Sequence, residues 1–145
     1  MKNILFVCVE NSCRSQIAEA FAIIYGSGLI NVFSSGSKPS GEINPKAIAS
    51  MRELNYDLTR HTSKSLDEIP QIEYDYVVTM GCGDNCPFVR AKNRIDWNIA
   101  DPKNMTMGEF SNVREEIKRR VKELVKLLVD TEYSSEENRS TFETV

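Results

Sequence analysis

Two side chains near the N-terminus have the types and the spacing of a nucleophile and an anion anchor. Cys8 carries a thiol and Arg14 a guanidinium, with five residues between them. Residues 4–7 form a short apolar run that predicts a buried strand, and residues 15–22 predict the start of a helix. Backbone N–H groups at a helix N-terminus bind anions and also stabilise a thiolate, while Arg offers a planar pair of donors to a tetrahedral oxyanion. The loop therefore combines a nucleophile with a site for phosphate or a similar anion.

Each of these two residues also has an ordinary structural explanation. A Cys at the end of an apolar strand is usually a small core residue, and an Arg at the start of a helix is usually solvated. Asn11, Ser12 and Ser15 lie between and just after the two. This concentration of polar groups favours the functional interpretation.

The complete loop has the sequence Cys8-Val9-Glu10-Asn11-Ser12-Cys13-Arg14-Ser15. It resembles the active-site loop of the low-molecular-weight protein tyrosine phosphatase superfamily. The chain continues with Gln16-Ile17-Ala18-Glu19-Ala20, which is similar to the arsenate reductase branch, since Gln commonly follows the Ser there and the phosphatases usually have Pro. The family usually has Gly at the position of Glu10. We expect this carboxylate to point to solvent, because it would repel an anion inside the loop.

The rest of the chain predicts the elements that position this loop. Strands are predicted over residues 3–9, 31–35, 74–80 and 93–97, and helices over residues 15–25, 44–54 and 110–129. This alternation predicts an α/β fold, a single domain with a four-stranded parallel sheet and helices on both faces. The resemblance implies the same low-molecular-weight phosphatase-like (flavodoxin-like) architecture. Residues 1–130 would form the domain and residues 131–145 a polar, disordered tail.

A second pair of thiols follows the third predicted strand. Cys82 is flanked by glycines, which let the backbone approach a neighbour closely, and Cys86 precedes a proline. A thiol on a mobile loop that faces an ionised thiol is suited to disulfide exchange, although both could be ordinary loop thiols. A further alternative is a Cys₄ zinc site composed of Cys8, Cys13, Cys82 and Cys86. The guanidinium in the same loop would repel a cation, so we favour disulfide exchange.

The resemblance implies a reaction and a set of partners. In thioredoxin-coupled arsenate reductases two resolving cysteines follow the third strand, and Cys82 and Cys86 match them in position with a shorter spacing. The implied reaction is reduction of arsenate through an adduct on Cys8, with thioredoxin, a glutaredoxin or a low-molecular-weight thiol as reductant and no bound cofactor or metal. The alternative is a protein tyrosine phosphatase that hydrolyses phosphate monoesters through a phosphocysteine on Cys8.

Asp101 follows the fourth predicted strand and precedes a proline. A carboxylic acid held over an anion site can protonate a leaving oxygen, although Asp-Pro turns are common. The resemblance implies that Asp101 is the general acid. His61, the only histidine, is expected to be an ordinary loop residue. Some relatives bind a monovalent cation beside the loop, but Lys64 stands where they have Asp, so we expect that site to be absent or weak.

Three further residues of the loop have expected roles. Ser15 should donate a hydrogen bond to the Cys8 thiolate. Asn11 should brace the loop, because Asn tolerates a left-handed backbone. Cys13 is either a bystander or the partner of Cys8 in a protective disulfide.

Composition excludes several classes of function. A chain of 145 residues fits one domain, and a net charge of −3 argues against a nucleic-acid partner. No apolar run approaches the ~20 residues that span a bilayer, and the N-terminal apolar stretch is too short for a signal peptide. We therefore expect a cytoplasmic protein whose four Cys are catalytic, redox-active or metal-binding rather than a disulfide framework.

Overall fold

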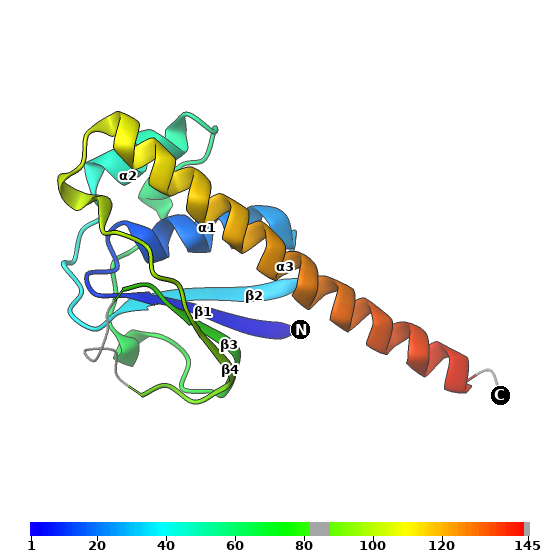
Figure 1. The fold of residues 1–145 in the computed structure, drawn as a ribbon. Coiled ribbons are helices and arrows are strands. Elements are labelled where there is room, and N and C mark those ends of the chain that lie inside the picture. The colour runs from blue at the N-terminus through cyan, green and yellow to red at the C-terminus, as the bar shows by residue number, and fades with distance from the viewer. Residues whose placement is uncertain (82–87, 144–145) are drawn as a thin grey trace.

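The structure, a computed structural model, describes residues 1–81 and 88–143, with side chains up to residue 130. Four parallel strands form one sheet in the order β2-β1-β3-β4 (Figure 1). The strands are β1 (Lys2–Cys8), β2 (Ile30–Gly36), β3 (Tyr74–Thr79) and β4 (Ala91–Asp96). The predicted class, an α/β fold built on a four-stranded parallel sheet, is confirmed.

The helical elements connect these strands. The α-helices are α1 (Arg14–Gly26), α2 (Pro45–Arg52) and α3 (Met107–Glu143), and the short 3₁₀ helices are η1 (Leu58–Arg60), η2 (Leu66–Glu68) and η4 (Pro102–Asn104). Asn44 caps α2, because its side chain accepts a hydrogen bond of 2.8 Å from the backbone N–H of Lys46. The predicted start of this helix is therefore confirmed.

β1 buries side chains on both faces of the sheet. Ile4, Phe6 and Cys8 join the larger core, to which α1, α2 and α3 all contribute. Leu5 and Val7 point the other way, as the alternation of a strand requires, and join a smaller cluster beside η2. The sequence predicted helices on both faces, which is wrong for the α-helices: all three gather on one face, because their apolar residues pack into a single core. The short 3₁₀ helix η2 and the segment leading into β3 cover the other face. Cys8 points to the face that α1 covers.

α3 is longer than the sequence predicted. Its apolar stripe is buried in the larger core, and comprises Val113, Ile117, Val121, Leu124, Val125 and Leu128. The backbone stays helical to Glu143, where a disordered tail was predicted, because residues 131–143 contain no Gly or Pro to end a helix. Figure 1 shows the last turns of α3 extending beyond the sheet. Among the helices that the structure describes, none is both long and apolar enough to cross a membrane.

Candidate active site

The loop between β1 and α1 is buried and tightly wound. Cys8 ends β1 with 2% of its surface exposed, and Arg14 begins α1 with 5% exposed. Asn11 has a φ of 49°, the left-handed conformation that the sequence predicted for it. Gly36, the pairing partner of Cys8 on β2, leaves space for the loop, because a Cβ there would come within 2.6 Å of the Val9 carbonyl oxygen.

The sulfur of Cys8 is held by a serine whose direction is set by an asparagine. Cys8 Sγ lies 2.9 Å from Ser15 Oγ, and Asn11 Nδ2 donates to the same oxygen at 2.7 Å. Because Asn11 occupies one lone pair of Ser15, the hydroxyl can turn its hydrogen towards the sulfur. A hydrogen bond in this direction stabilises a thiolate over a thiol.

Asn11 uses every hydrogen-bonding site of its side chain. Besides Ser15, its Nδ2 donates to Ser34 Oγ at 3.1 Å, and its Oδ1 accepts from Gln16 Nε2 at 2.8 Å and from the Lys64 backbone N–H at 2.9 Å. An amide has two donors and two acceptor lone pairs, so none is left unsatisfied. Asn11 therefore braces the loop, as predicted, through partners that the sequence did not indicate.

His61 belongs to a buried network one step behind Asn11. Its Nδ1 lies 2.8 Å from Glu19 Oε1 and 3.0 Å from Gln16 Oε1, and its Nε2 lies 2.7 Å from the Tyr56 hydroxyl. The sequence predicted an ordinary loop residue, and gave no signal for this network because Gln16 and His61 are 45 residues apart. Among the contacts of the described residues, His61 is linked to the loop only through Gln16, which bonds to Asn11. His61 therefore supports the loop and does not line the anion site.

Arg14 connects the loop to the segment that follows β4. Its Nη1 donates to the Ile99 carbonyl at 3.1 Å, and its Nη2 lies 3.8 Å from Asp101 Oδ2. Its Nε is buried and has no hydrogen-bond partner among the residues that the structure describes. Since buried donors are normally paired, this N–H is available to an anion bound in the loop.

Asp101 meets the loop from an exposed position. Its side chain is 46% exposed. Asp101 caps η4, because its Oδ1 accepts a hydrogen bond of 3.1 Å from the Lys103 backbone N–H. The fold thus brings Asp101 to Arg14, although the two are far apart in the chain. A carboxylic acid that touches both water and an anion site can take up and release a proton there.

Glu10 pairs with a lysine on η4. Its Oε1 lies 3.0 Å from Lys103 Nζ, and the two side chains are 37% and 49% exposed. The hydrogen bond that Lys103 donates to the Glu10 carboxylate is the main cause of a raised pKa at Lys103. The sequence predicted that this carboxylate would point to solvent. The Glu10 side chain is indeed partly exposed, and its carboxylate also pairs with an ammonium group on η4.

Cys13 is buried beside Cys8 and free of a disulfide in the described structure. Burial first, and then the charges of Asp101 and Cys8, raise the pKa of its thiol to about 12. Cys13 is therefore a neutral thiol at physiological pH, which favours a bystander over the partner of Cys8 in a protective disulfide, because a neutral thiol reacts slowly.

The second cysteine pair begins where β3 ends. Cys82 and Cys86 lie outside the described residues. Gly81, directly before Cys82, has a φ of 74°, and a Cβ there would come within 2.5 Å of Arg14 Nη1. The glycine predicted to allow a close backbone approach therefore does so, against the guanidinium of the anion loop.

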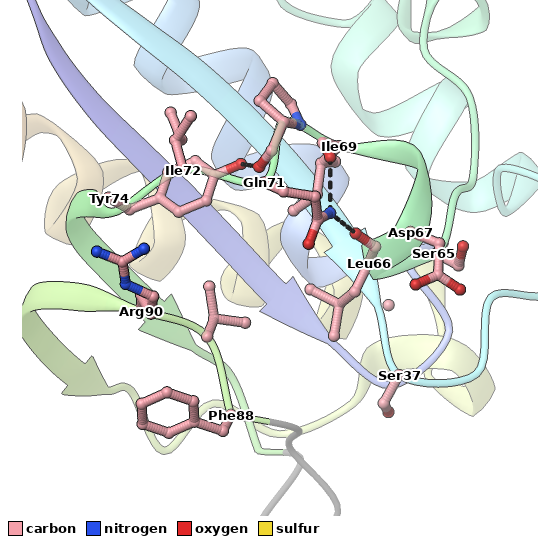
Figure 2. A pocket seen from close by; sticks show the side chains of 13 residues that line it. Ser37, Ser65, Leu66, Asp67, Ile69, Gln71, Ile72, Tyr74, Phe88 and Arg90 are labelled. Carbon is pink, nitrogen blue, oxygen red and sulfur yellow. Dashed lines mark hydrogen bonds between the residues drawn. The ribbon is translucent and has the colours of Figure 1, made fainter.

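A cavity of about 700 Å³ opens on the other face of the sheet (Figure 2). Its lining includes Leu66, Ile69, Tyr74, Phe88 and Arg90, and none of Cys8, Arg14 or Asp101. The Gln71 amide and the Tyr74 hydroxyl bond to backbone carbonyls of the same wall. The candidate site is instead the small cradle of the β1–α1 loop, which suits an anion of a few atoms.

The chain is similar to known proteins over most of its length. The chain is 40% identical over 128 residues to the glutaredoxin arsenate reductase of Synechocystis sp., which covers 86% of this chain and 97% of that protein. A solved arsenate reductase in its phosphate-binding state is 40% identical, with a TM-score of 0.79 over 87% of this chain and 98% of that one.

A second solved structure, the thioredoxin-dependent arsenate reductase of Corynebacterium glutamicum, is 35% identical. Its TM-score is 0.70 over 87% of this chain and 60% of that one. Residues 3–134 match the family described as low molecular weight phosphotyrosine protein phosphatase. The Cys-to-Arg loop, the sheet that carries it and these relatives lead to one conclusion: the chain belongs to the low molecular weight phosphotyrosine protein phosphatase family, in its arsenate reductase branch.

Proposed function

We propose that this protein reduces arsenate to arsenite. The observation that carries the proposal is the arrangement at the β1–α1 loop, where Ser15 lies 2.9 Å from the Cys8 sulfur and Arg14 keeps a buried, unpartnered Nε–H. Arsenate and phosphate share a tetrahedral shape and negative charge, so either would accept hydrogen bonds from this guanidinium. The relatives named as arsenate reductases support the choice of arsenate.

The first step is attack by the Cys8 thiolate on arsenic. A sulfur–arsenic bond forms, an arsenic–oxygen bond breaks, and the leaving hydroxide takes a proton from Asp101 and departs as water. Arg14 stabilises the charge on the remaining oxygens. The distance of 3.8 Å between Arg14 Nη2 and Asp101 Oδ2 supports these roles, because it places a carboxyl group, which must carry a proton before this step, beside the anchor of the anion.

The second step releases arsenite. The Cys82 thiolate attacks the Cys8 sulfur, the electron pair of the sulfur–arsenic bond stays on arsenic, and arsenic is reduced from the +5 to the +3 state. A Cys8–Cys82 disulfide results, and Cys86 then attacks Cys82, which frees Cys8 and leaves a Cys82–Cys86 disulfide. The close approach of Gly81 to Arg14 supports this step, since Cys82 is the next residue.

The reductant closes the cycle by supplying two electrons to the last disulfide. We propose thioredoxin, or a glutaredoxin with a low-molecular-weight thiol, because relatives of both descriptions exist. The cytoplasm is the proposed compartment, since its thiol systems keep such a disulfide reducible. Arsenate-dependent consumption of NADPH, measured with thioredoxin and its reductase and then with glutaredoxin and glutathione, separates the two.

Disulfide mapping tests the order of the relay. After arsenate is added to Cys86→Ser, mass spectrometry should find a Cys8–Cys82 disulfide, and the wild type should accumulate Cys82–Cys86. Cys13→Ser is the matched control, and should behave as the wild type. If arsenate induces no disulfide in any of these proteins, the reaction proposed here is wrong.

Hydrolysis of phosphate monoesters is the second candidate, and it rests on the same Cys8, Arg14 and Asp101. A phosphocysteine needs no resolving thiol, so Cys82→Ser should leave phosphatase turnover intact and abolish arsenate reduction. Turnover of p-nitrophenyl phosphate and of arsenate by wild type and Cys82→Ser decides between the activities. A Cys82→Ser variant that still reduces arsenate catalytically would contradict the relay.

A further inference from the structure

The segment that carries Asp101 has few attachments to the anion loop. Asp101 is about half exposed, and its direct contact with the loop is the ion pair of 3.8 Å to Arg14. Arg14 also donates to the Ile99 carbonyl at 3.1 Å. Among the described residues, the second ionic contact between the two regions is the pair of Glu10 and Lys103, at 3.0 Å and 93 residues apart in the chain. This second contact is therefore in a position to decide where the segment lies.

The Glu10 end of this contact is firmly held. Its backbone carbonyl accepts hydrogen bonds from the Ser40 backbone N–H and from Ser63 Oγ, both at 3.0 Å. Glu10 lies two positions after Cys8, and Asn11 and Ser12, which follow it, are buried. The backbone of Glu10 is thus held close to the nucleophile, and Lys103 is the partner of the carboxylate that extends from it.

The Lys103 end is coupled directly to Asp101. The Lys103 backbone N–H donates to Asp101 Oδ1 at 3.1 Å, so a shift of Lys103 is transmitted to the carboxylate. Lys46 on α2 holds the far side of the same turn, because its Nζ donates to the Met105 carbonyl at 2.7 Å and lies 3.4 Å from that of Lys103. The turn is therefore held between α2 and the anion loop.

We propose that Glu10 and Lys103 form an ionic bridge that positions the general acid Asp101 over the anion loop. Both are positioning residues, because they act through Asp101 rather than on the substrate. The inference rests on the proposed arsenate reduction for its kinetic readout.

A charge-swap experiment tests the bridge. Glu10→Gln and Lys103→Met should each lower kcat/KM for arsenate by about two- to fivefold, the range expected for an exposed ion pair. The double variant should be no slower than the slower single variant, and Glu10→Lys/Lys103→Glu should recover most of the activity. Glu123→Gln, which removes an exposed ion pair on α3, is the matched control and should keep wild-type activity.

Affinity for inorganic phosphate separates positioning from a direct effect of charge. If Glu10 and Lys103 acted on the anion itself, Glu10→Gln would tighten phosphate binding and Lys103→Met would weaken it. A positioning bridge changes kcat/KM in the same direction in both variants and leaves the dissociation constant for phosphate, measured by calorimetry, within about twofold. Opposite shifts in phosphate affinity, additive losses in the double variant, or single variants with full activity would each overturn the proposal.

Amide hydrogen exchange keeps this test independent of the reaction. The Lys103 N–H is bonded to Asp101, so its exchange should become several-fold faster in Glu10→Gln and return towards the wild-type rate in the charge-swapped protein. If the wild type fails to reduce arsenate, the proposed function is wrong, and exchange at Lys103 still decides on the bridge. Unchanged exchange in Glu10→Gln would reject the bridge whatever the activity.

Discussion

The two regions that meet at the candidate site are built in opposite ways. The β1–α1 loop is mostly buried, and Asn11 alone makes four side-chain hydrogen bonds that tie it to α1, to β2 and to Lys64. The segment around η4 is exposed and is held by side chains such as Lys46 and Glu10. A nucleophile and an anion cradle benefit from a rigid site with little water. A proton donor must be reprotonated from water after each turnover, which an exposed carboxylate allows.

Arg14 belongs to both regions, so its replacement should have the largest effect. Arg14→Lys keeps a positive charge but loses the planar pair of donors and the bond to the Ile99 carbonyl. We expect kcat/KM for arsenate to fall roughly 10²- to 10³-fold, as when one donor to a developing oxyanion is removed. Steady-state kinetics with the chosen reductant measures this. A loss below tenfold would mean that a positive charge alone is enough to stabilise the oxyanion, without the planar pair of donors.

Asp101→Asn isolates the proton donor of the exposed region. An amide oxygen can still accept from the Lys103 N–H, so the cap of η4 is kept while the acid is lost. We expect kcat for arsenate to fall about 10²-fold with little change in thermal unfolding. Asp67→Asn, on the far side of the sheet, serves as the control. An Asp101→Asn variant with wild-type turnover would remove Asp101 from the mechanism.

Asn11→Ala tests the rigidity of the buried region. The substitution leaves several buried groups without a hydrogen-bond partner and places Ala in a left-handed conformation. We therefore expect a loss of about 3 kcal/mol in the free energy of unfolding. Urea unfolding followed by circular dichroism gives the value. Asn31→Ala, which removes only an exposed hydrogen bond, should cost less than about 0.5 kcal/mol. Equal losses in the two variants would contradict the difference between the regions.

Cys13 should show the smallest effect. Its pKa of about 12 keeps the thiol neutral below about pH 10, so iodoacetamide should not label it there, and labelling should rise only as the pH approaches 12. Peptide mapping after brief alkylation at pH 7 should find modified Cys8 and intact Cys13. Rapid labelling of Cys13 at neutral pH would show that its burial is not what the structure indicates.

The sequence predicted the buried loop better than the exposed segment. Ser15 was expected to contact Cys8 and Asn11 to adopt a left-handed backbone, and both are observed. These features depend on residues at most seven positions apart, so local types and spacing suffice. In the exposed segment, the sequence did not predict that Lys103 pairs with Glu10, whose side chain is 37% exposed, because the two residues are 93 positions apart and no local pattern contains the contact.

The sequence by itself determined the class of fold and the chemistry of the loop. A buried strand, a thiol and a guanidinium at the start of a helix define an anion site through short-range backbone geometry. Only the tertiary structure decided which residues contact the loop and its neighbours. The pairs that it brings within hydrogen-bond distance are Gln16 with His61, Arg14 with Ile99, and Glu10 with Lys103. These pairs are 45, 85 and 93 residues apart. The last two meet because parallel strands bring the segments after β1 and β4 to one edge of the sheet, whereas His61 comes from the connection between α2 and β3.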